Sequence, residues 1–179
     1  MNIHQTVEIR ALTANDASAY WQIRLEALEL DPEAFSESAD AHRSLTVEDV
    51  AARLSSDPEN NFIMGAFAGD SSTGKRLVGT AGFYRNKGIK VRHKGHIWGV
   101  YVALGARGIG TGQKMLRALL DRALNLPGLE QITLAVGATQ EPAVKLYQTL
   151  GFEPYGCERR ALKIAGCYID EVQMVRFVK

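Results

Sequence analysis

The sequence predicts an α/β (α+β) fold in which four helices flank a mixed, mostly antiparallel sheet of seven strands. Two observations carry this prediction. Strand-like and helical segments alternate in the order β, α, α, β, β, β, α, β, α, β, β, and polar or glycine turns join two of the strand pairs as hairpins. In addition, a single helix separates two apolar strands in the middle of the chain, which requires a right-handed crossover between parallel neighbours.

Residue patterns and turn signals mark the segments. In chain order these are strand 7–12, helix 17–30, helix 46–55, strands 61–69 and 76–86, strand 96–103, helix 113–124, strand 131–136, helix 142–150, and strands 153–163 and 168–178. Thr13 with Asp16, and Thr46 with Asp49, are capping pairs that predict the first two helix starts. Between these helices, residues 31–40 carry a proline, serines and four acids without a period, which predicts an ordered but mobile loop.

The first hairpin is predicted from the polar turn 69–75, and the second from Ala165-Gly166. The basic run 85–94 contains no acidic residue. A solvated loop is the commoner outcome for such a run, and contact with nucleic acid or an acidic protein is the alternative.

A glycine turn at residues 105–112 separates the strand 96–103 from the helix 113–124. Glycines at a helix N-terminus let backbone N–H groups surround an anion, and the helix dipole favours negative charge there. The turn therefore predicts a phosphate or pyrophosphate site, with a plain tight loop as the alternative. No Gly-Lys-Ser/Thr follows, the glycine spacing is not that of a dinucleotide fingerprint, and the next strand ends without an acidic residue for a ribose.

Length and composition limit the remaining possibilities. With 179 residues, 46% of them hydrophobic, the chain predicts one domain over 1–179. A net charge of +1 gives no reason to expect nucleic acid or a membrane surface as a partner. Without a signal-like N-terminus or a long apolar run, a cytoplasmic location is expected. Cys157 and Cys167 are expected to be reduced thiols, and no cluster has metal-ligand spacing.

Two motifs together carry a resemblance to a known family. Arg107-x-x-Gly110-x-Gly112 follows an apolar strand, and Leu146-Tyr147-x-x-Leu150-Gly151-Phe152 lies on the later helix. In this order and separation they resemble the acetyl-coenzyme A site of the GNAT superfamily of N-acetyltransferases. The resemblance implies acetyl-coenzyme A as co-substrate, an amine acceptor, no metal, and a central parallel strand pair that is splayed at the cofactor site.

The resemblance also implies roles for individual residues. The pyrophosphate is expected on the backbone of Gly108, Ile109, Gly110, Thr111 and Gly112, with Arg107 alongside. The pantetheine arm is expected to pair like an extra strand with Val100, Tyr101 and Val102. Gln140 stands where the family usually has asparagine, and Lys145 is expected either at a coenzyme phosphate or exposed to solvent. Tyr147 matches the family tyrosine near the coenzyme sulfur, where a phenol stabilises or protonates the departing thiolate, and the alternative is a core tyrosine.

Three further features, a glycine, a histidine and a group of acids, have two interpretations each. Gly99 suits the bulge that opens the strands or close packing against a large neighbour. His96 lies four places before Val100, where some similar members place a catalytic glutamate. It is therefore a candidate general base, or a half-buried structural histidine. Glu33, Glu37 and Asp40 either attract a cationic amine in the acceptor region or are simply solvated.

The function implied is direct acetyl transfer from acetyl-coenzyme A to a primary amine of a small molecule, peptide or protein in a ternary complex. A non-catalytic acyl-coenzyme A sensor and a domain that binds ATP or NAD at the glycine turn are the alternatives. The acceptor, the acyl chain length and the oligomeric state stay open, with a homodimer as one option.

Overall fold

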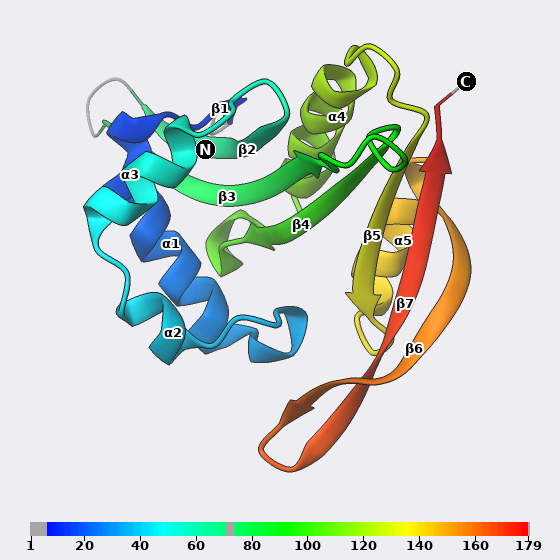
Figure 1. Cartoon of the computed structure of the whole chain (residues 1–179). Coiled ribbons are helices and arrows are strands. Elements are labelled where there is room, and N and C mark those ends of the chain that lie inside the picture. Colours follow the sequence, from blue (N-terminus) through cyan, green and yellow to red (C-terminus); the bar gives the residue numbers. More distant parts are fainter. Residues whose placement is uncertain (1–6, 71–73, 179) are drawn as a thin grey trace.

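The computed structural model describes residues 7–70 and 74–178 and confirms the predicted architecture (Figure 1). Seven strands form one sheet in the order β1-β2-β3-β4-β5-β7-β6. The strands are β1 (Glu8–Ala11), β2 (Asn61–Asp70), β3 (Gly74–Arg85), β4 (Lys94–Val102), β5 (Gln131–Gly137), β6 (Glu153–Ile164) and β7 (Cys167–Phe177). Every neighbouring pair is antiparallel except β4 with β5. The mixed sheet predicted from the segment order is therefore correct.

The parallel pair β4–β5 is hydrogen-bonded over a short length only. Its register joins Lys94–His96 to Gln131–Thr133 and then stops. Figure 1 shows the two strands lying together near the top of the view and separating downward. The lower half of β4 therefore has no strand partner on its β5 side, as the family resemblance implied.

Gly99 forms the bulge that bends β4 where the strands part. Thr80 of β3 pairs with Tyr101 and Gly82 pairs with Trp98, so Gly99 and Val100 together oppose one residue of β3. Gly99 has φ +61°, in the left-handed region that favours glycine. Its neighbour is also close, because a Cβ at Gly99 would lie 3.4 Å from Nη1 of Arg24. The bulge prediction is confirmed, and close packing accompanies it.

The described residues form five α-helices where four were predicted. They are α1 (Ala17–Leu30), α2 (Ala39–Arg43), α3 (Val47–Ser55), α4 (Thr111–Leu124) and α5 (Glu141–Thr149). The prediction that residues 31–40 are all loop was wrong at its end, where α2 begins. Ser38 caps α2 by accepting a hydrogen bond from the backbone N–H of Ala41. With only five residues, α2 is too short to show a helical period in sequence.

Helices cover both faces of the sheet. Trp98 and Gly82 face α1, whose Arg24 lies over the Trp98 ring. Gly79 faces α4, whose Met115 sulfur would lie 3.5 Å from a Cβ at that glycine. The two cysteines are free, as expected, and both are exposed. In the part of the chain that the structure describes, no helix combines the length and apolar character that crossing a bilayer requires.

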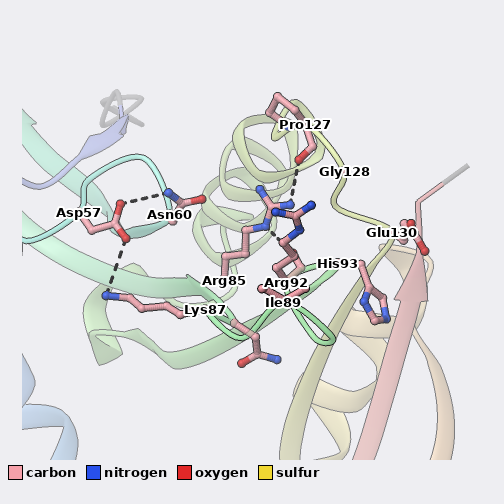
Figure 2. Close-up of a pocket in the computed structure, with 11 residues that line it drawn as sticks. Asp57, Asn60, Arg85, Lys87, Ile89, Arg92, His93, Pro127, Gly128 and Glu130 are labelled. Atoms are coloured by element: carbon pink, nitrogen blue, oxygen red, sulfur yellow. Dashed lines mark hydrogen bonds and ion pairs between the residues drawn. The ribbon is translucent and has the colours of Figure 1, made fainter.

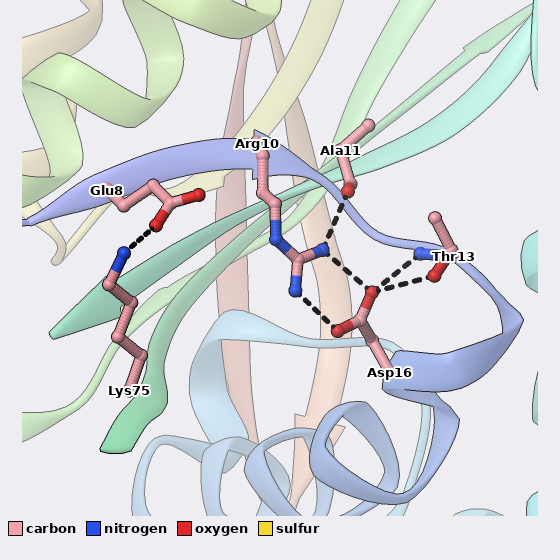
Figure 3. Close-up of polar contacts among 6 residues, drawn as sticks. All are labelled: Glu8, Arg10, Ala11, Thr13, Asp16 and Lys75. Carbon is pink, nitrogen blue, oxygen red and sulfur yellow. Dashed lines mark hydrogen bonds and ion pairs between the residues drawn. The ribbon is translucent and has the colours of Figure 1, made fainter. Parts of the chain in front are cut away.

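A polar cluster fastens the start of α1 to the edge strand β1 (Figure 3). The guanidinium of Arg10 donates to both carboxylate oxygens of Asp16, at 2.8 and 2.7 Å. Asp16 also accepts from the backbone N–H and the hydroxyl of Thr13, so the predicted pair Thr13–Asp16 is present, around a 3-10 turn that leads into α1. Hydrogen bonding to Arg10, then to Thr13, lowers the pKa of Asp16 from 3.8 to about 2.

We expect Asp16→Asn to destabilise the protein by about 1 kcal/mol at pH 7, because the neutral amide keeps few of these charge-assisted bonds. The full pKa difference would predict more, but Arg10 is 41% exposed and solvent screens its charge. A carboxyl whose pKa is lower in the folded protein stabilises above its unfolded pKa and stops doing so as pH falls. The difference between wild type and variant, measured by urea unfolding, should therefore shrink from about pH 4 to pH 2. Asp40→Asn, at a 92% exposed carboxylate, is the control and should cost less than half as much.

Candidate active site

A cavity of about 340 Å³ occupies the space between the parted strands. Its walls come from the lower half of β4, the end of β5, the first turns of α5 and the segment after α1. The lining residues are Asp31, Ala34, Phe35, Ile97, Trp98, Gly99, Val100, Tyr101, Val102, Arg107, Ala135, Val136, Gly137, Gln140, Pro142, Ala143, Leu146 and Tyr147. Most of them are apolar. Six of the residues predicted to contact the coenzyme line this one cavity: Val100, Tyr101, Val102, Arg107, Gln140 and Tyr147.

The freed edge of β4 gives this cavity a hydrogen-bonding wall. Beyond His96, the backbone of β4 makes no ladder with β5. An extended ligand can pair with such an edge as an added strand, using main-chain groups and few side chains. Tyr101 is held beside this edge because its hydroxyl donates to Glu26 of α1 at 3.0 Å, and burial raises the pKa of its phenol to about 12.

The glycine turn leads from β4 into the N-terminus of α4. Gly108 has φ +76°, and Gly110, the N-cap of α4, has φ +82°. Apart from their own chain neighbours, no atom of the described structure lies within 4 Å of the positions that their Cβ atoms would take, so the space beside both residues is open. Thr111 in the first turn of α4 is only 2% exposed, and its hydroxyl finds no partner among the described residues. A diphosphate fits this turn, because open space and helix N-terminal amides are what an anion needs.

Arg107 does not extend freely from the turn. Its Nε donates to the backbone oxygen of Val102 at 2.7 Å, and its Nη2 pairs with Asp31. The guanidinium also lies 5.4 Å from the centre of the Tyr101 ring. Arg107 therefore ties the turn to the end of β4, and its contact with a phosphate stays a prediction.

Tyr147 lines the cavity from α5 and is only 6% exposed. Its ring meets Phe152 edge to face, with centroids 6.1 Å apart. Burial raises the pKa of the phenol far above its ordinary value of 10. Tyr147 therefore packs in the core, as the alternative expected. Because it also lines the cavity with a phenol that stays protonated, its role at the coenzyme sulfur stays a prediction.

His96 lies on β4 at the last hydrogen-bonded position of the parallel pair. Its Nδ1 is 3.0 Å from the hydroxyl oxygen of Thr133, and that hydroxyl donates to the backbone oxygen of Gly95. When the hydroxyl donates to Gly95, Nδ1 carries the ring proton and donates to Thr133, and this tautomer leaves the Nε2 lone pair to accept a proton. Burial lowers the pKa of the ring, which favours the neutral form. His96 lies two residues before Trp98 and does not line the cavity itself.

Gln140 and Lys145 take different positions. Gln140 is the N-cap residue of α5 and lines the cavity. Lys145 is 75% exposed and lies 3.6 Å from Glu141, one turn earlier. Contact between Lys145 and a coenzyme phosphate stays a prediction.

The three acids expected near the acceptor are not gathered into one cluster. Glu37 accepts two hydrogen bonds from Arg24, whereas Asp40 pairs with Arg43 and is 92% exposed. Glu33 lies exposed in the short turn Pro32–Ala34. Attraction of a cationic amine by these residues stays a prediction, and each lacks the burial that would strengthen it.

Sequence reasoning missed Arg24. It lies on the buried face of α1 together with Tyr20, Ile23 and Ala27, and is only 6% exposed. The signal was readable, because an arginine among apolar residues at helical spacing must either reach solvent or find a partner inside.

A larger cavity, of about 710 Å³, lies at the other end of the sheet (Figure 2). The basic run 85–94 supplies much of its wall. Arg85 donates to the backbone oxygens of Arg92 and Pro127, and Lys87 is 3.9 Å from Asp57. Arg85 therefore joins two loops of the protein itself, as expected for the solvated-loop alternative. Within residues 7–70 and 74–178, no cluster of three His, Cys, Asp or Glu side chains is arranged to hold a metal ion.

The parallel strands β4 and β5 separate beside the N-terminus of α4, where there is room for an anion. The acetyltransferase resemblance implied this arrangement. The model of the acetyltransferase (GNAT) family matches residues 20–152, and the chain belongs to this family of acyltransferases. The N-alpha-acetyltransferase RimI of Mycobacterium tuberculosis is 33% identical over 110 residues. That match spans 61% of this chain and 62% of the length of the curated relative.

Solved structures share the fold over nearly the whole chain. A GNAT-family acetyltransferase from Streptococcus pneumoniae has a TM-score of 0.83 at 23% identity, over 97% of this chain and 100% of that one. A GCN5-related N-acetyltransferase from Kribbella flavida has a TM-score of 0.77 at 25% identity, over 96% and 97%. A phosphinothricin acetyltransferase from Sinorhizobium meliloti, solved in complex with AcCoA, has a TM-score of 0.79 at 22% identity, over 97% and 89%.

Proposed function

We propose that the chain is an N-acetyltransferase that moves the acetyl group of acetyl-coenzyme A to a primary amine by direct attack in a ternary complex. The observation that carries this proposal is the cavity between β4 and β5, which is open to strand-like pairing along β4 and carries Tyr147 on its α5 side. The family match and the relatives, one an N-alpha-acetyltransferase and one solved with AcCoA, support the same chemistry. A cytoplasmic location and a single domain over 1–179 remain part of the proposal.

The coenzyme would be held by main-chain groups at two places. The amides of residues 108–112 would receive its diphosphate, and the backbone of Val100, Tyr101 and Val102 would pair with its pantetheine arm. When bound, acetyl-coenzyme A supplies a thioester whose carbonyl carbon accepts the amine. Backbone N–H groups at the bulge, at Val100 or beside it, would donate to the carbonyl oxygen as negative charge develops there.

The phenol of Tyr147 would donate a hydrogen bond to the departing thiolate. A thiol such as cysteine has a pKa of about 8.5, and the phenol lies far above that value. Full proton transfer from this phenol to the thiolate is therefore uphill. Tyr147 acts by stabilising the developing negative charge on sulfur, rather than as the final source of the proton.

The amine must be neutral before it can attack, and His96 is our candidate for accepting its proton, through water. Because burial lowers the pKa of His96, its neutral form should dominate at pH 7. After correction for the neutral fraction of the amine, kcat/KM should fall as the pH drops through a value below 6.5. In His96→Ala this limb should disappear, and kcat/KM at pH 7 should drop about 100-fold.

His93→Ala is the matched control for this pH profile, because His93 lines the cavity at the opposite end of the sheet. It should leave the profile unchanged. If His96→Ala also left the acid limb in place, proton removal would be assigned to a water route without His96.

The proposal is tested by measuring release of free coenzyme A from acetyl-coenzyme A in the presence of a panel of amines that includes amino acids, polyamines, aminoglycosides and peptides. Amine-dependent release is expected. Binding of acetyl-coenzyme A without such release from any amine would instead indicate a sensor. Protection against thermal unfolding by ATP or NAD, and none by acetyl-coenzyme A, would indicate a nucleotide-binding domain.

A further inference from the structure

A second cavity, of about 160 Å³, lies between α1, α3 and the sheet. Tyr20 and Arg24 of α1, Val50 and Leu54 of α3, and Trp98 of β4 contribute to its walls. Trp98 also lines the cavity between the parted strands, so this one residue connects the two spaces. The volume is below the roughly 300–1,000 Å³ of a pocket that encloses a drug-sized ligand, so the cavity suits one small molecule or part of one.

Arg24, in the wall of this second cavity, has one guanidinium nitrogen without a hydrogen-bond partner among the described residues. Its Nε and Nη2 both donate to Oε2 of Glu37, each at 3.0 Å. Its Nη1 is buried and has no hydrogen-bond partner among the described residues, although the side chain is only 6% exposed. A buried N–H of a charged group without an acceptor is unfavourable. A ligand atom that accepts from Nη1 would remove this cost.

The Nη1 atom of Arg24 lies close to the bulge of β4, where the proposed acetyl transfer takes place. It would lie 3.4 Å from a Cβ at Gly99, and Gly99 forms the bulge that lines the first cavity. The guanidinium also lies over the rings of Phe35, at 4.5 Å, and Trp98, at 5.9 Å. Phe35 lines the first cavity as well. The unpaired nitrogen therefore lies where the two cavities adjoin, close to the bulge at which the proposed function places the thioester carbonyl that the amine attacks.

The charges and hydrogen-bond donors in the wall of the second cavity favour binding of an anion. Arg24 and Arg53 line it against a single carboxylate, Glu37, which leaves one net positive charge. Trp98 Nε1 is a second buried donor without a partner among the described residues, and it lies over Gly82, where an added Cβ would be only 2.7 Å away. The Nε2 atom of His42, also in the wall, is 3.0 Å from the backbone oxygen of Trp21 and so donates to it. The remaining ring nitrogen of His42 lies 3.7 Å from Oε1 of Glu37. Two buried N–H groups of this wall, on Arg24 and Trp98, lack an acceptor, which is what a bound anion would supply.

We infer that Arg24 binds a carboxylate of the acceptor, so that the amine acetylated by this protein belongs to a small amino acid or a similar molecule with a carboxylate close to its amino group. The inference rests on the proposed function and names its substrate class. The amine would lie at the Gly99 bulge, and the carboxylate would accept from Nη1 of Arg24. Polyamines and aminoglycosides lack the anion, and a peptide N-terminus has an amide in its place.

The test measures coenzyme A release for several amino acids, each beside its own amide and its decarboxylated amine, for example leucine, leucinamide and 3-methylbutylamine. Rates are compared per neutral amine, because the three differ in amine pKa. We expect kcat/KM to be about tenfold to a hundredfold higher for the amino acid than for its two analogues, the range expected for a hydrogen bond to a charged group. Equal rates for the three, or a clear preference for polyamines or peptides, would overturn the inference.

Variants assign the preference to Arg24. Arg24→Gln should abolish it by raising KM for the amino acid, and Arg24→Lys should keep part of it. Because Arg24→Gln leaves Glu37 without its partner, the double variant Arg24→Gln with Glu37→Gln is made as well, and acetyl-coenzyme A binding verifies that both are folded. Arg43→Gln, at a surface arginine that pairs with Asp40, is the matched control and should keep the preference. A preference that survives in a folded Arg24→Gln protein would contradict the role of Arg24.

A binding measurement separates this inference from the proposed function. The amine-free acid, 4-methylpentanoate for leucine, is titrated with coenzyme A present, and protection against thermal unfolding is recorded. Protection of the wild type but not of Arg24→Gln supports the carboxylate site even if no amine releases coenzyme A, in which case only the proposed function fails. Amine-dependent release without any difference between wild type and Arg24→Gln in either measurement would leave the proposed function standing and reject the inference.

Discussion

Gly110→Val should weaken acetyl-coenzyme A binding more than 100-fold while the protein still folds. Gly110 has φ +82°, which a β-branched residue adopts only with strain, so the turn before α4 would shift. The valine side chain would also enter the open space beside the turn, where the diphosphate is expected. Loss of two or more charge-assisted hydrogen bonds, at about 1.5–3 kcal/mol each, accounts for a factor of this size. Calorimetric titration of the coenzyme gives the Kd directly.

Gly105→Ala is the matched control, because Gly105 lies in the same connection without a left-handed φ and with no atom near its missing Cβ. It should bind the coenzyme within about threefold of wild type. If Gly110→Val bound equally well, the diphosphate would not rest on this turn, and the proposed coenzyme site would be wrong.

Tyr147→Phe should lower kcat about 100-fold and change the Kd for acetyl-coenzyme A by less than threefold. The phenylalanine keeps the ring packed against Phe152 and removes only the hydroxyl. A single donor directed at developing charge in a closed site is worth about 10²–10³ in rate. The split between kcat and Kd distinguishes a bond made to the departing thiolate from one made to the bound coenzyme.

Tyr155→Phe serves as the control for this variant, because Tyr155 lies on β6 with its ring 60% exposed. Both of its constants should match wild type. If kcat of Tyr147→Phe also matched wild type, Tyr147 would be a packing residue only, and another group would have to stabilise the sulfur.

The sequence was informative where local chemistry decides the structure. The turn Ala165-Gly166 gave the last hairpin, and both residues have positive φ, as a two-residue turn of this kind requires. Gly99 indicated either a bulge or close packing, because a glycine inside an apolar strand is typical of both, and the structure shows the bulge with Arg24 close by. Both capping pairs are present, at Thr13–Asp16 and Thr46–Asp49. Each of these signals involves neighbours in the chain, which a pattern can show.

The parts that depend on distant contacts were not predictable in the same way. Which acids are free and which are paired depends on partners far along the chain, such as Arg24 for Glu37 and Arg107 for Asp31. The small helix α2 depends on a cap and on packing against α1 rather than on a period. The unpaired nitrogen of Arg24 is visible only once β4, α1 and the segment around Phe35 are brought together.

A crystal structure of the protein grown with acetyl-coenzyme A tests the account most directly. We expect the diphosphate within hydrogen-bond distance of the backbone N–H groups of residues 108–112, the pantetheine arm along β4 between Val100 and Val102, and the sulfur beside the hydroxyl of Tyr147. A coenzyme bound instead in the basic cavity beside Arg85 and Arg92, or at any place that leaves the turn before α4 empty, would contradict it.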